Sequence, residues 1–422
     1  MLERRGREKV MAFVMAGGEG SRLRPLTKDR CKPAVPFGSR YRIVDFVLSN
    51  LVNSDIRSIY VLVQYKPQSL IEYIRKAWTV STLFPEQFVT VVPPQMTKEH
   101  TLFGGTADAV YQSLNLMEMH RPDLVLVFGA DHIYRMDVRQ MVRFHCENEA
   151  DVTVAALPVP LDQACHFGII ETDKAGRISG FQEKPLQAKT LPHDPQRAYA
   201  SMGNYLFNAD LLRAALEDAH KRGETDFGIH VLPCLSKSHR VLAYDFATNA
   251  VPGTKSYEEK GYWRDVGTLD AYFEAHLDGL GMEPRFDAFN PRWPIFSSHY
   301  HGPTAQVFRG ELDNVCLGAA AIVSDAKIRN SILRREVVVE SGAQIEDCVI
   351  MDYVRIGAGA KLRRTIIDRH NVIASGTQIG YDHERDHAAG HHVTEGGLVV
   401  VPLGDVRYYS RDDHRTGGAY SE

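Results

Sequence analysis

Runs of apolar residues alternate with amphipathic stretches through about residue 275 of the chain. Residues 59–63 form a short β-type run, and residues 69–75 follow with apolar positions at helical spacing. Residues 124–128 and 137–145 repeat this order. Alternation of strand and helix favours a sheet with helices on both faces, so we predict an α/β fold for this part of the chain.

The pattern changes in the later part of this region. Residues 152–159, 176–181 and 201–207 are β-rich and are separated by Pro, Gly and Asp. We expect them to complete the same domain, with a mixed sheet. A stretch with prolines and aromatic residues at 283–303 then interrupts the pattern and indicates a connector. We predict an N-terminal domain at 1–280, a linker at 281–304 and a C-terminal domain at 305–422.

The C-terminal region repeats every 17 residues. Apolar residues recur at this interval in three columns: Ile322, Val339, Ile356 and Ile373; Ile328, Ile345, Leu362 and Ile379; Leu333, Ile350 and Ile367. Glycines recur in register with them at positions 342, 359 and 376. Short parallel strands that turn at small residues produce such a period, so we predict a left-handed parallel β-helix. A β-sandwich, the alternative, requires no such register.

A glycine-rich loop follows the first apolar run. It reads AGGEGSRLRPLT, with KPA shortly after it, at residues 16–27 and 32–34. Gly17, Gly18 and Gly20 let backbone N–H groups approach phosphate oxygens closely, while Arg22 and Lys32 supply positive charge. The loop has neither the third glycine of a dinucleotide fingerprint nor a Walker Gly-Lys-Ser/Thr. We predict a triphosphate-binding loop; a simple strand-to-helix turn is the alternative.

Composition narrows the range of partners. The chain has 422 residues, 44% hydrophobic and 24% charged, which is enough for two or three packed domains. A formal net charge of −4 argues against a nucleic-acid or anionic-membrane partner. The six cysteines contain no Cys-x-x-Cys pair, so we expect neither a zinc ribbon nor a disulfide framework, and a reducing cytoplasm fits.

Two aspartates are candidate metal ligands. Asp131 follows the apolar run 124–128, at the end of a strand where open α/β sheets bind ligands. Asp265 lies in the segment Trp-Arg-Asp-Val-Gly-Thr, far away in sequence. Two carboxylates together with triphosphate oxygens would make an oxygen-rich Mg²⁺ site. Taken singly, either aspartate is more typical of a helix cap or turn.

Further candidates have an ordinary alternative as well. Glu183 and Lys184 end a predicted strand and offer a carboxylate for sugar hydroxyls and an ammonium for a sugar phosphate, although such a pair is usually only solvated. Ser201 begins another predicted strand, where it could contact a sugar or cap a turn. Gly105 and Thr106 open a predicted helix, whose N-terminus could hold phosphate or base or be an ordinary cap.

Two short motifs are discounted. Residues 383–387 match His-Glu-x-x-His, and His391 offers a third zinc ligand. The segment is charged and has no apolar face with which a helix could pack, so a zinc protease is not predicted. Residues 226–228 read Asp-Phe-Gly as in kinases, but no His-Arg-Asp loop precedes them.

Taken together, these motifs resemble the sugar-nucleotide pyrophosphorylases, and most closely the bacterial glucose-1-phosphate adenylyltransferase family. The likeness rests on the glycine loop and on the segments 32–35, 41–46, 105–109, 131–134, 183–185, 201–203 and 263–268, and it covers nearly the whole chain. It implies a Rossmann-like nucleotidyltransferase domain before the β-helix. It also implies that ATP and α-D-glucose 1-phosphate give ADP-glucose and pyrophosphate in the committed step of glycogen synthesis. A homotetramer controlled by small-molecule effectors is implied as well.

The resemblance assigns a role to each candidate residue. Arg22, Lys32 and Asp131 would be catalytic, and Asp131 and Asp265 would hold Mg²⁺. Glucose 1-phosphate would be bound by Gly168, Glu183, Lys184 and Ser201. The nucleotide would be bound by Gly17, Gly18, Gly20, Gln95, Gly105 and Thr106.

The resemblance leaves the regulation and the exact substrates open. The resemblance makes Arg24, within the signature loop, a candidate for an effector site, because it stands where enterobacterial members carry a lysine associated with a sugar-bisphosphate activator. Arg24 keeps the charge but would bind phosphate through a planar guanidinium, so the identity of the activator stays open. Arg363, Arg364 and Arg369 could complete an anion site, or simply form a solvated face. Three alternatives remain: a pyrophosphorylase for another nucleotide or sugar, a non-catalytic regulatory subunit, and a β-helix acyltransferase.

Overall fold

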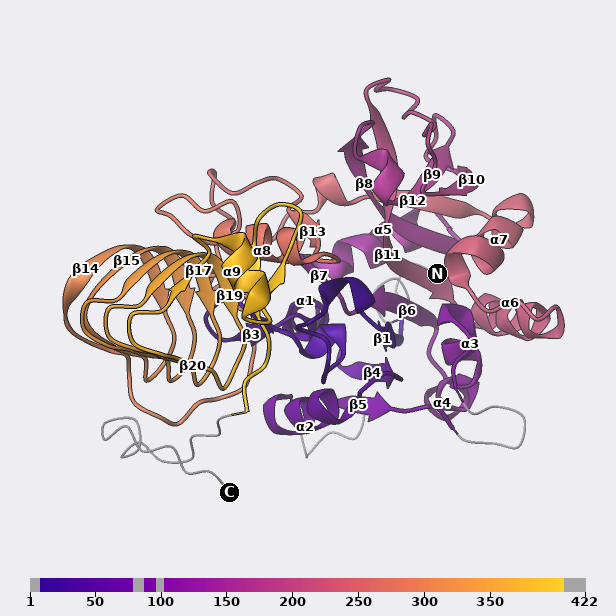
Figure 1. Ribbon diagram of the computed structural model, residues 1–422. Helices are drawn as coiled ribbons and strands as arrows, with labels where there is room; N and C mark the ends of the chain where they lie inside the picture. Colours follow the sequence, from indigo (N-terminus) through magenta and orange to yellow (C-terminus); the bar gives the residue numbers. More distant parts are fainter. Residues whose placement is uncertain (1–7, 79–86, 96–101, 406–422) are drawn as a thin grey trace. The chain divides into compact units, whose positions relative to one another are not determined.

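The computed structural model describes residues 8–78, 87–95 and 102–405 (Figure 1). The chain divides into two compact units, each assembled from separate segments. The first contains Met1–Gly18, Phe46–Thr254 and Pro291–Ile295, and the second contains Glu19–Asp45, Lys255–Asn290 and Phe296–Glu422. The glycine-rich loop therefore contributes Gly17 and Gly18 to the first unit and Gly20 to the second.

The first unit is built on a nine-stranded mixed sheet. β1 pairs in parallel with β4 and β6, and β5 extends this half beyond β4. β11 pairs antiparallel with β6 and β9, and it pairs antiparallel with β8 along its opposite edge. The strands are β1 (Val10–Ala16), β4 (Ser58–Val63), β5 (Phe88–Val92), β6 (Leu124–Gly129), β8 (Val152–Pro160), β9 (Gly168–Thr172), β10 (Ile178–Glu183), β11 (Arg197–Asn208) and β12 (Val241–Asp245). The mixed α/β fold is confirmed.

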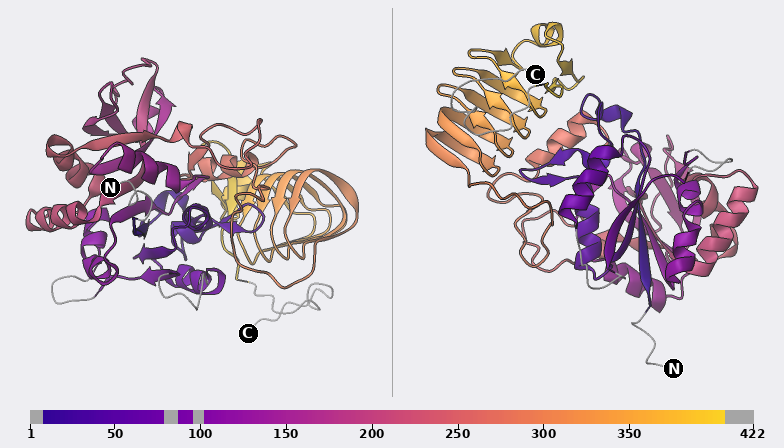
Figure 2. Two further views of the ribbon diagram at one scale, coloured as in Figure 1. Left: turned by 180° about the vertical axis from the view of Figure 1, so that it is seen from behind. Right: turned by 90° about the horizontal axis from the view of Figure 1, so that it is seen from below.

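Helices lie on both faces of this sheet (Figure 2). The central strands β1 and β6 are almost entirely buried because both of their faces are covered, which explains their continuous apolar runs. α5 buries Val138, Met141 and His145, which lie on one side of a helix. The α-helices are α1 (Val44–Asn53), α2 (Gln68–Ala77), α3 (Thr106–Tyr111), α4 (Leu114–His120), α5 (Val138–Glu147), α6 (Ala209–Lys221) and α7 (Leu232–Ser238).

Short elements complete the first unit. They are the strand β7 (His132–Tyr134), the 3-10 helices η3 (Ala164–His166) and η5 (Phe246–Thr248), and the π-helix η4 (Phe227–Val231). Asp226 caps η4 by accepting the N–H of Ile229. β7 follows β6 after two residues, so the segment that carries Asp131 is a very short connection.

The second unit begins with small elements packed on one helix. Tyr272 of α8 (Leu269–Leu277) donates its hydroxyl to the carbonyl of Pro36, and the Phe37 ring lies 4.1 Å from that of His276. The remaining elements here are η1 (Ser21–Leu23), η2 (Lys32–Ala34), β2 (Pro36–Phe37), β3 (Tyr41–Arg42) and β13 (Trp263–Asp265). No helix or strand lies between α8 and the first solenoid strand, where the sequence predicts a connector.

A parallel solenoid forms the rest of the second unit, and its coils appear as a stack in Figure 2. Ile328, Ile345, Leu362 and Ile379 face one another in register, as do Leu333, Ile350 and Ile367, so two predicted columns are confirmed. The strands are β14 (Gln306–Leu317), β15 (Ile322–Leu333), β16 (Val338–Val339), β17 (Gln344–Ile350), β18 (Arg355–Ile356), β19 (Lys361–Ile367), β20 (Val372–Ile373), β21 (Gln378–Ile379), β22 (His392–Val393) and β23 (Val399–Val401). A short helix, α9 (His383–Ala388), is inserted before the last two.

The remaining column is displaced by one residue in one coil. Val339 pairs with Val323, not with Ile322, and Val323 is completely buried. The placement of Ile322 in this column was therefore wrong. The segment from Val323 to Ile328 is one residue shorter than the corresponding segment from Val339 to Ile345, so the register recovers at the next strand.

The corners of the coils are residues in left-handed backbone conformation. Asp325, Gly342, Gly359 and Gly376 recur at one corner with φ between 47° and 77°. A second corner carries Asn330, Asp347 and Arg364, and a third carries Glu336, Tyr353 and His370. Three such corners per coil give a triangular cross-section, and only one of them uses glycine regularly.

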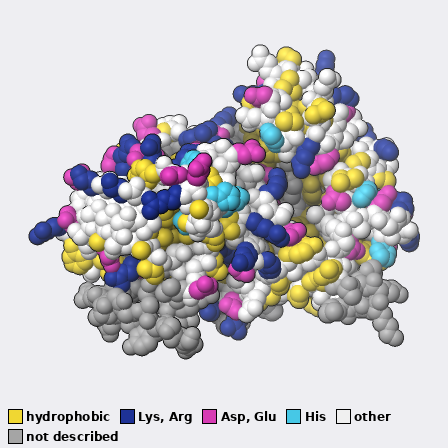
Figure 3. Space-filling model, in the orientation of Figure 1, with side chains coloured by type: hydrophobic (Ala, Val, Ile, Leu, Met, Phe, Trp, Pro, Cys, Tyr) yellow, Lys and Arg dark blue, Asp and Glu magenta, His cyan; other side chains and the backbone are white. Residues whose placement is uncertain are grey.

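Lys and Arg side chains are interspersed with Asp and Glu on the face shown in Figure 3. Among the helices of residues 8–78, 87–95 and 102–405, none has the length and apolarity needed to cross a bilayer.

Candidate functional site

At one position of the glycine-rich loop, the backbone has a conformation that only glycine adopts easily. Gly20 has φ of 65°, and a Cβ there would lie 3.2 Å from Lys32 Cβ and from Thr27 Cγ2. At Gly18, by contrast, a Cβ would have no atom within 4 Å. Gly20 is therefore required by the fold of the second unit, while Gly18 leaves open space beside the backbone.

Two cations of the second unit flank one carboxylate. Lys32 Nζ lies 3.0 Å from Asp265 Oδ1, and the lysine side chain is only 8% exposed. A Cβ on Gly267 would lie 3.1 Å from an Nη atom of Arg22 and 3.1 Å from Asp265 Oδ1, so Gly267 leaves room for both groups. Arg22 is exposed. The second unit thus brings Asp265 beside Arg22 and Lys32, which lie in a distant part of the sequence.

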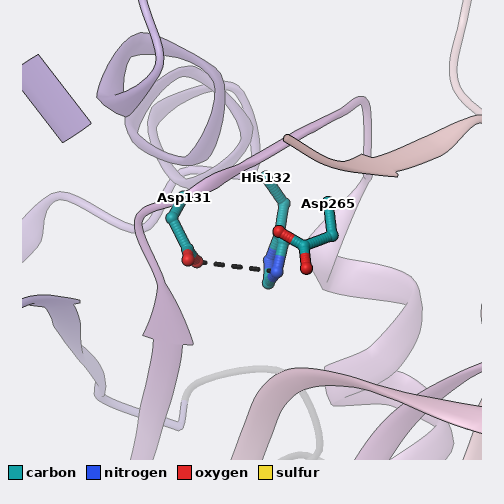
Figure 4. Close-up of side chains that lie close together, drawn as sticks. All are labelled: Asp131, His132 and Asp265. Carbon is teal, nitrogen blue, oxygen red and sulfur yellow. Dashed lines mark ion pairs between the residues drawn. The ribbon is translucent and has the colours of Figure 1, made fainter. Parts of the chain in front are cut away.

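Asp131 lies in the short connection between β6 and β7 of the first unit. Its Oδ1 lies 3.5 Å from His132 Nε2, and its side chain is 39% exposed (Figure 4). A Cβ on Gly129 would lie 3.2 Å from Asp131 Oδ1, so the glycine leaves space for the carboxylate. Asp265, also labelled in Figure 4, belongs to the second unit.

Glu183 and Lys184 end β10 in a strained turn. Lys184 has φ of 45°, which is uncommon for a residue with a side chain, and its N–H donates to the Phe167 carbonyl. The two side chains are more than half exposed, and Lys184 Nζ lies 3.6 Å from Glu183 Oε1. Gly168 faces Glu183 across the β9–β10 pair, and a Cβ there would lie 3.1 Å from Glu183 Oε2. Gly168 therefore makes room for the Glu183 carboxylate.

Ser201 precedes a β-bulge in β11. The pairing with β8 is shifted between Ser201 and Tyr205, and Gly203 within the shift has φ of 68°. Gly203 N–H donates to Ser201 Oγ at 3.3 Å, and a Cβ on Gly203 would lie 3.9 Å from His132 Cε1. The bulge thus brings the Ser201 segment next to the residues that follow β6.

Tyr205 and Asp226 were not predicted as functional. Burial raises the pKa of Tyr205 to about 12, the hydrogen bond with Ser201 opposes this, and the charges of Asp226 and Glu183 add to the rise. Asp226 Oδ2 accepts a hydrogen bond from Thr106 Oγ1 at 3.0 Å. Asp226 belongs to the Asp-Phe-Gly motif that is discounted as a kinase motif. Its contact with Thr106 joins residues that are far apart in sequence, so only the structure reveals it.

Two backbone N–H groups at the start of α3 already donate hydrogen bonds within the protein. The N–H groups of Ala107 and Asp108 both donate to the Thr225 carbonyl, at 2.8 and 3.2 Å. A Cβ on Gly105 would lie 2.5 Å from that same oxygen, which explains the glycine. Thr106 remains a candidate for nucleotide binding, but these two amides are occupied.

Other predicted residues lie apart from these groups or in ordinary surroundings. Gln95 is exposed. Arg24 is exposed and pairs with Glu19 at 2.7 Å. In the discounted zinc motif, Asp386 is buried and accepts the N–H of Gly380, as a structural residue would.

A buried group of arginines lies between the solenoid and residues 30–42 of the second unit. Arg30 pairs with Asp368, and Arg334 pairs with Asp352 at 3.1 Å and donates to the Phe37 carbonyl at 2.8 Å. Burial lowers the pKa of Arg369 to about 10, and the Arg30 guanidinium acts in the same direction. Arg30 Nη1 and Arg369 Nε are buried without a hydrogen-bond partner. Arg364 instead lies over Phe273 and near Glu274.

Comparisons with known proteins agree with this arrangement. The family model described as "Nucleotidyl transferase" matches residues 11–280, and the one described as "GlmU-like, C-terminal hexapeptide" matches residues 303–401. A glucose-1-phosphate adenylyltransferase of Thermodesulfovibrio yellowstonii is 53% identical over 395 residues, which are 93% of this chain and 96% of the relative. The chain belongs to the glucose-1-phosphate adenylyltransferase family.

Other members of the glucose-1-phosphate adenylyltransferase family match over a similar length. The Thermus thermophilus member is 46% identical over 410 residues, 94% of this chain and 98% of the relative. The Photobacterium profundum member is 44% identical over 402 residues, 94% and 98% respectively. The predicted resemblance and enzyme class are confirmed, while the roles of individual residues stay predictions.

Proposed function

We propose that this protein transfers the adenylyl group of ATP to α-D-glucose 1-phosphate, giving ADP-glucose and pyrophosphate. The observation that supports this most is the shared name of relatives that match over more than nine-tenths of the chain. The grouping of Arg22, Lys32 and Asp265 in the second unit supports it independently, because adenylyl transfer requires cations around a triphosphate.

The reaction requires positioning more than proton transfer. A phosphate oxygen of glucose 1-phosphate attacks the α-phosphorus of ATP, a new O–P bond forms, and the bond to the β-phosphate oxygen breaks as pyrophosphate leaves. Because the nucleophile is already an anion, no general base is needed. Arg22 would stabilise the departing pyrophosphate, with Lys32 assisting, while Lys184 would bind the sugar phosphate. Glu183 and Ser201 would orient the glucose hydroxyls.

A divalent cation fits the carboxylates available. Asp131 and Asp265 are both partly exposed, and oxygen ligands completed by water are what Mg²⁺ prefers. We propose that these two residues hold Mg²⁺, which would neutralise phosphate charge when bound. His132 offers nitrogen, which suits Mg²⁺ less well.

We also propose small-molecule regulation through the buried arginines. Arg30 and Arg369 carry unpartnered N–H groups in the second unit, and two neighbouring aspartates do not neutralise the cluster completely. A phosphorylated effector would fit this charge better than it fits the exposed Arg24. A homotetramer acting in cytoplasmic glycogen synthesis completes the proposal.

The direct test is turnover by the purified full-length chain. We expect pyrophosphate release with ATP, glucose 1-phosphate and Mg²⁺ together, and release that depends strongly on each of the three. Other nucleoside triphosphates and sugar 1-phosphates serve as controls, and preference for one of them would identify a different pyrophosphorylase. No turnover with any pair, at any effector concentration, would favour the regulatory subunit instead.

A further inference from the structure

Asn204 is a fully buried polar side chain next to the candidate site. It lies on β11, opposite Phe128 of β6, with no exposed surface. Its Oδ1 accepts the N–H of Gly129 at 3.3 Å, and its Nδ2 donates to the Tyr134 hydroxyl at 3.1 Å. One amide group therefore contacts both ends of the segment 129–134 that contains Asp131.

The orientation of this amide is determined by its partners. A backbone N–H can only donate, so the oxygen of the Asn204 amide must face Gly129. The NH₂ group then faces Tyr134, whose hydroxyl must accept. A side chain of the same size without both a donor and an acceptor cannot make this pair of contacts.

A second buried asparagine holds the far end of the same segment. Asn50 of α1 is 2% exposed; its Nδ2 donates to the Tyr134 carbonyl at 3.2 Å, and its Oδ1 accepts the N–H of Met136 at 3.0 Å. The backbone that carries Asp131 is therefore fixed from the side of β11 and from α1. A buried and fully bonded polar network of this kind makes a segment rigid.

Asn204 also lies within the bulge of β11, next to Gly203. The pairing of β11 with β8 stops at Ser201 and resumes at Tyr205, and the pairing of β11 with β6 begins between them, at Asn204. A bulge next to a functional segment often redirects a side chain. Ser201 and Asn204, which contacts the segment that carries Asp131, therefore lie three positions apart on the same strand.

We propose that Asn204 is a positioning residue for adenylyl transfer, which acts by holding the Gly129–Tyr134 segment so that the Asp131 carboxylate has a fixed place. This inference rests on the proposed role of Asp131. It predicts that loss of the amide lowers kcat more than it weakens substrate binding, because supporting residues of this kind typically contribute about 10- to 100-fold to activity.

The test compares three variants of the full-length protein. Asn204→Leu keeps the size but removes both hydrogen bonds, and Tyr134→Phe removes one oxygen atom. Asn208→Leu is the matched control, because Asn208 lies on the same strand and its contacts are with His145 and the Ala150 carbonyl. We expect kcat to fall roughly 50-fold for Asn204→Leu and roughly 10-fold for Tyr134→Phe, with each KM within about threefold of wild type. The control should keep its kcat.

A second readout does not depend on turnover. Hydrogen–deuterium exchange of the peptide covering residues 129–136 should be faster in Asn204→Leu than in wild type and unchanged in Asn208→Leu. If the two hydrogen bonds act as one device, the double variant Asn204→Leu/Tyr134→Phe should be no slower in turnover than Asn204→Leu alone.

Two results would overturn the inference. One is a kcat for Tyr134→Phe equal to that of wild type, which decides the matter even if Asn204→Leu does not fold. The other is equal loss in Asn204→Leu and Asn208→Leu, which would indicate a general packing effect. Asp131→Asn separates this inference from the proposed function: if that variant keeps full activity, the role of Asp131 itself is wrong.

Discussion

Each unit presents a lysine–carboxylate pair, and the two pairs differ in their surroundings. In the second unit Lys32 is 8% exposed and lies 3.0 Å from Asp265. In the first unit Lys184 is 54% exposed and lies 3.6 Å from Glu183, which is 58% exposed. A buried charge without its partner is costly, whereas an exposed pair opens at little cost. We infer that Lys32 is fixed in place for the reacting phosphates and that Lys184 is free to follow the sugar phosphate.

The largest effect should come from removing the buried ammonium. Lys32→Ala removes one of the two cations beside Asp265 and a charge from the proposed phosphate site. We expect kcat to fall by roughly 1,000-fold, the size typical of a preorganised electrostatic group. Steady-state kinetics with Lys28→Ala, an exposed lysine of the same segment, provide the comparison. A Lys32→Ala enzyme with near-normal kcat would show that the Lys32–Asp265 pair stabilises the fold and does not take part in catalysis.

Removing the exposed ammonium should change binding instead. Lys184→Ala should raise the KM for glucose 1-phosphate by roughly 100-fold, the value of a charged hydrogen bond to phosphate, while the KM for ATP changes little. Lys189→Ala is the control, because Lys189 is also exposed and paired, with Glu171. Equal increases in both KM values would remove Lys184 from the sugar-phosphate site.

A third prediction concerns stability in acid. Burial lowers the pKa of His276, on α8 of the second unit, to about 3. The unfolded chain takes up this proton below a pH of about 6.5 and the folded chain does not, so stability is complete above that pH and is lost as the pH falls toward 3. Between pH 7 and pH 5 this one group should reduce the free energy of unfolding by about 2 kcal/mol.

His276→Phe tests that expectation by removing the titrating group while keeping a ring against Phe37. Denaturant unfolding gives the free energy of unfolding of wild type and variant at each pH. The difference between these two free energies should change by about 2 kcal/mol between pH 7 and pH 5. A difference that is independent of pH would mean that His276 has the same pKa in the folded and the unfolded chain. Activity at pH 7 is expected to be unchanged.

The smallest effect belongs to the exposed carboxylate. Glu183→Gln should change the free energy of unfolding by less than about 0.5 kcal/mol, because an exposed pair contributes little. Its effect should appear only as a modest rise in the KM for glucose 1-phosphate. A large loss of thermal stability would contradict the distinction between the two pairs.

The sequence predicted those parts of the fold that depend on local periodicity. The buried strands β4 and β6 and two of three solenoid columns follow directly from apolar spacing. The third column was misplaced at Ile322 because a turn one residue shorter leaves no trace in a pattern where Ile322 and Val323 are both apolar. Local pattern alone does not determine which of two adjacent apolar residues faces inward.

The family resemblance named the candidate residues of the site, but the sequence did not predict which of their side chains contact one another. Nothing in the sequence around Lys32 and Asp265 indicates that their side chains meet, because the two residues are 233 positions apart and the chain between them must first fold. Tyr205, Asp226 and Asn204 were missed for the same reason. Each of these residues lies at or beside a bulge or a capped turn, and its contacts are with segments distant in sequence.

The most direct test of the contrast between the two pairs is a kinetic matrix in which both substrates are varied for Lys32→Ala and Lys184→Ala. We expect Lys32→Ala to lose kcat at saturating concentrations of both substrates, whereas Lys184→Ala should recover most of its kcat when the concentration of glucose 1-phosphate is raised. If both variants lose the same parameter to the same extent, the buried and the exposed pair do not have separate tasks, and the account is wrong.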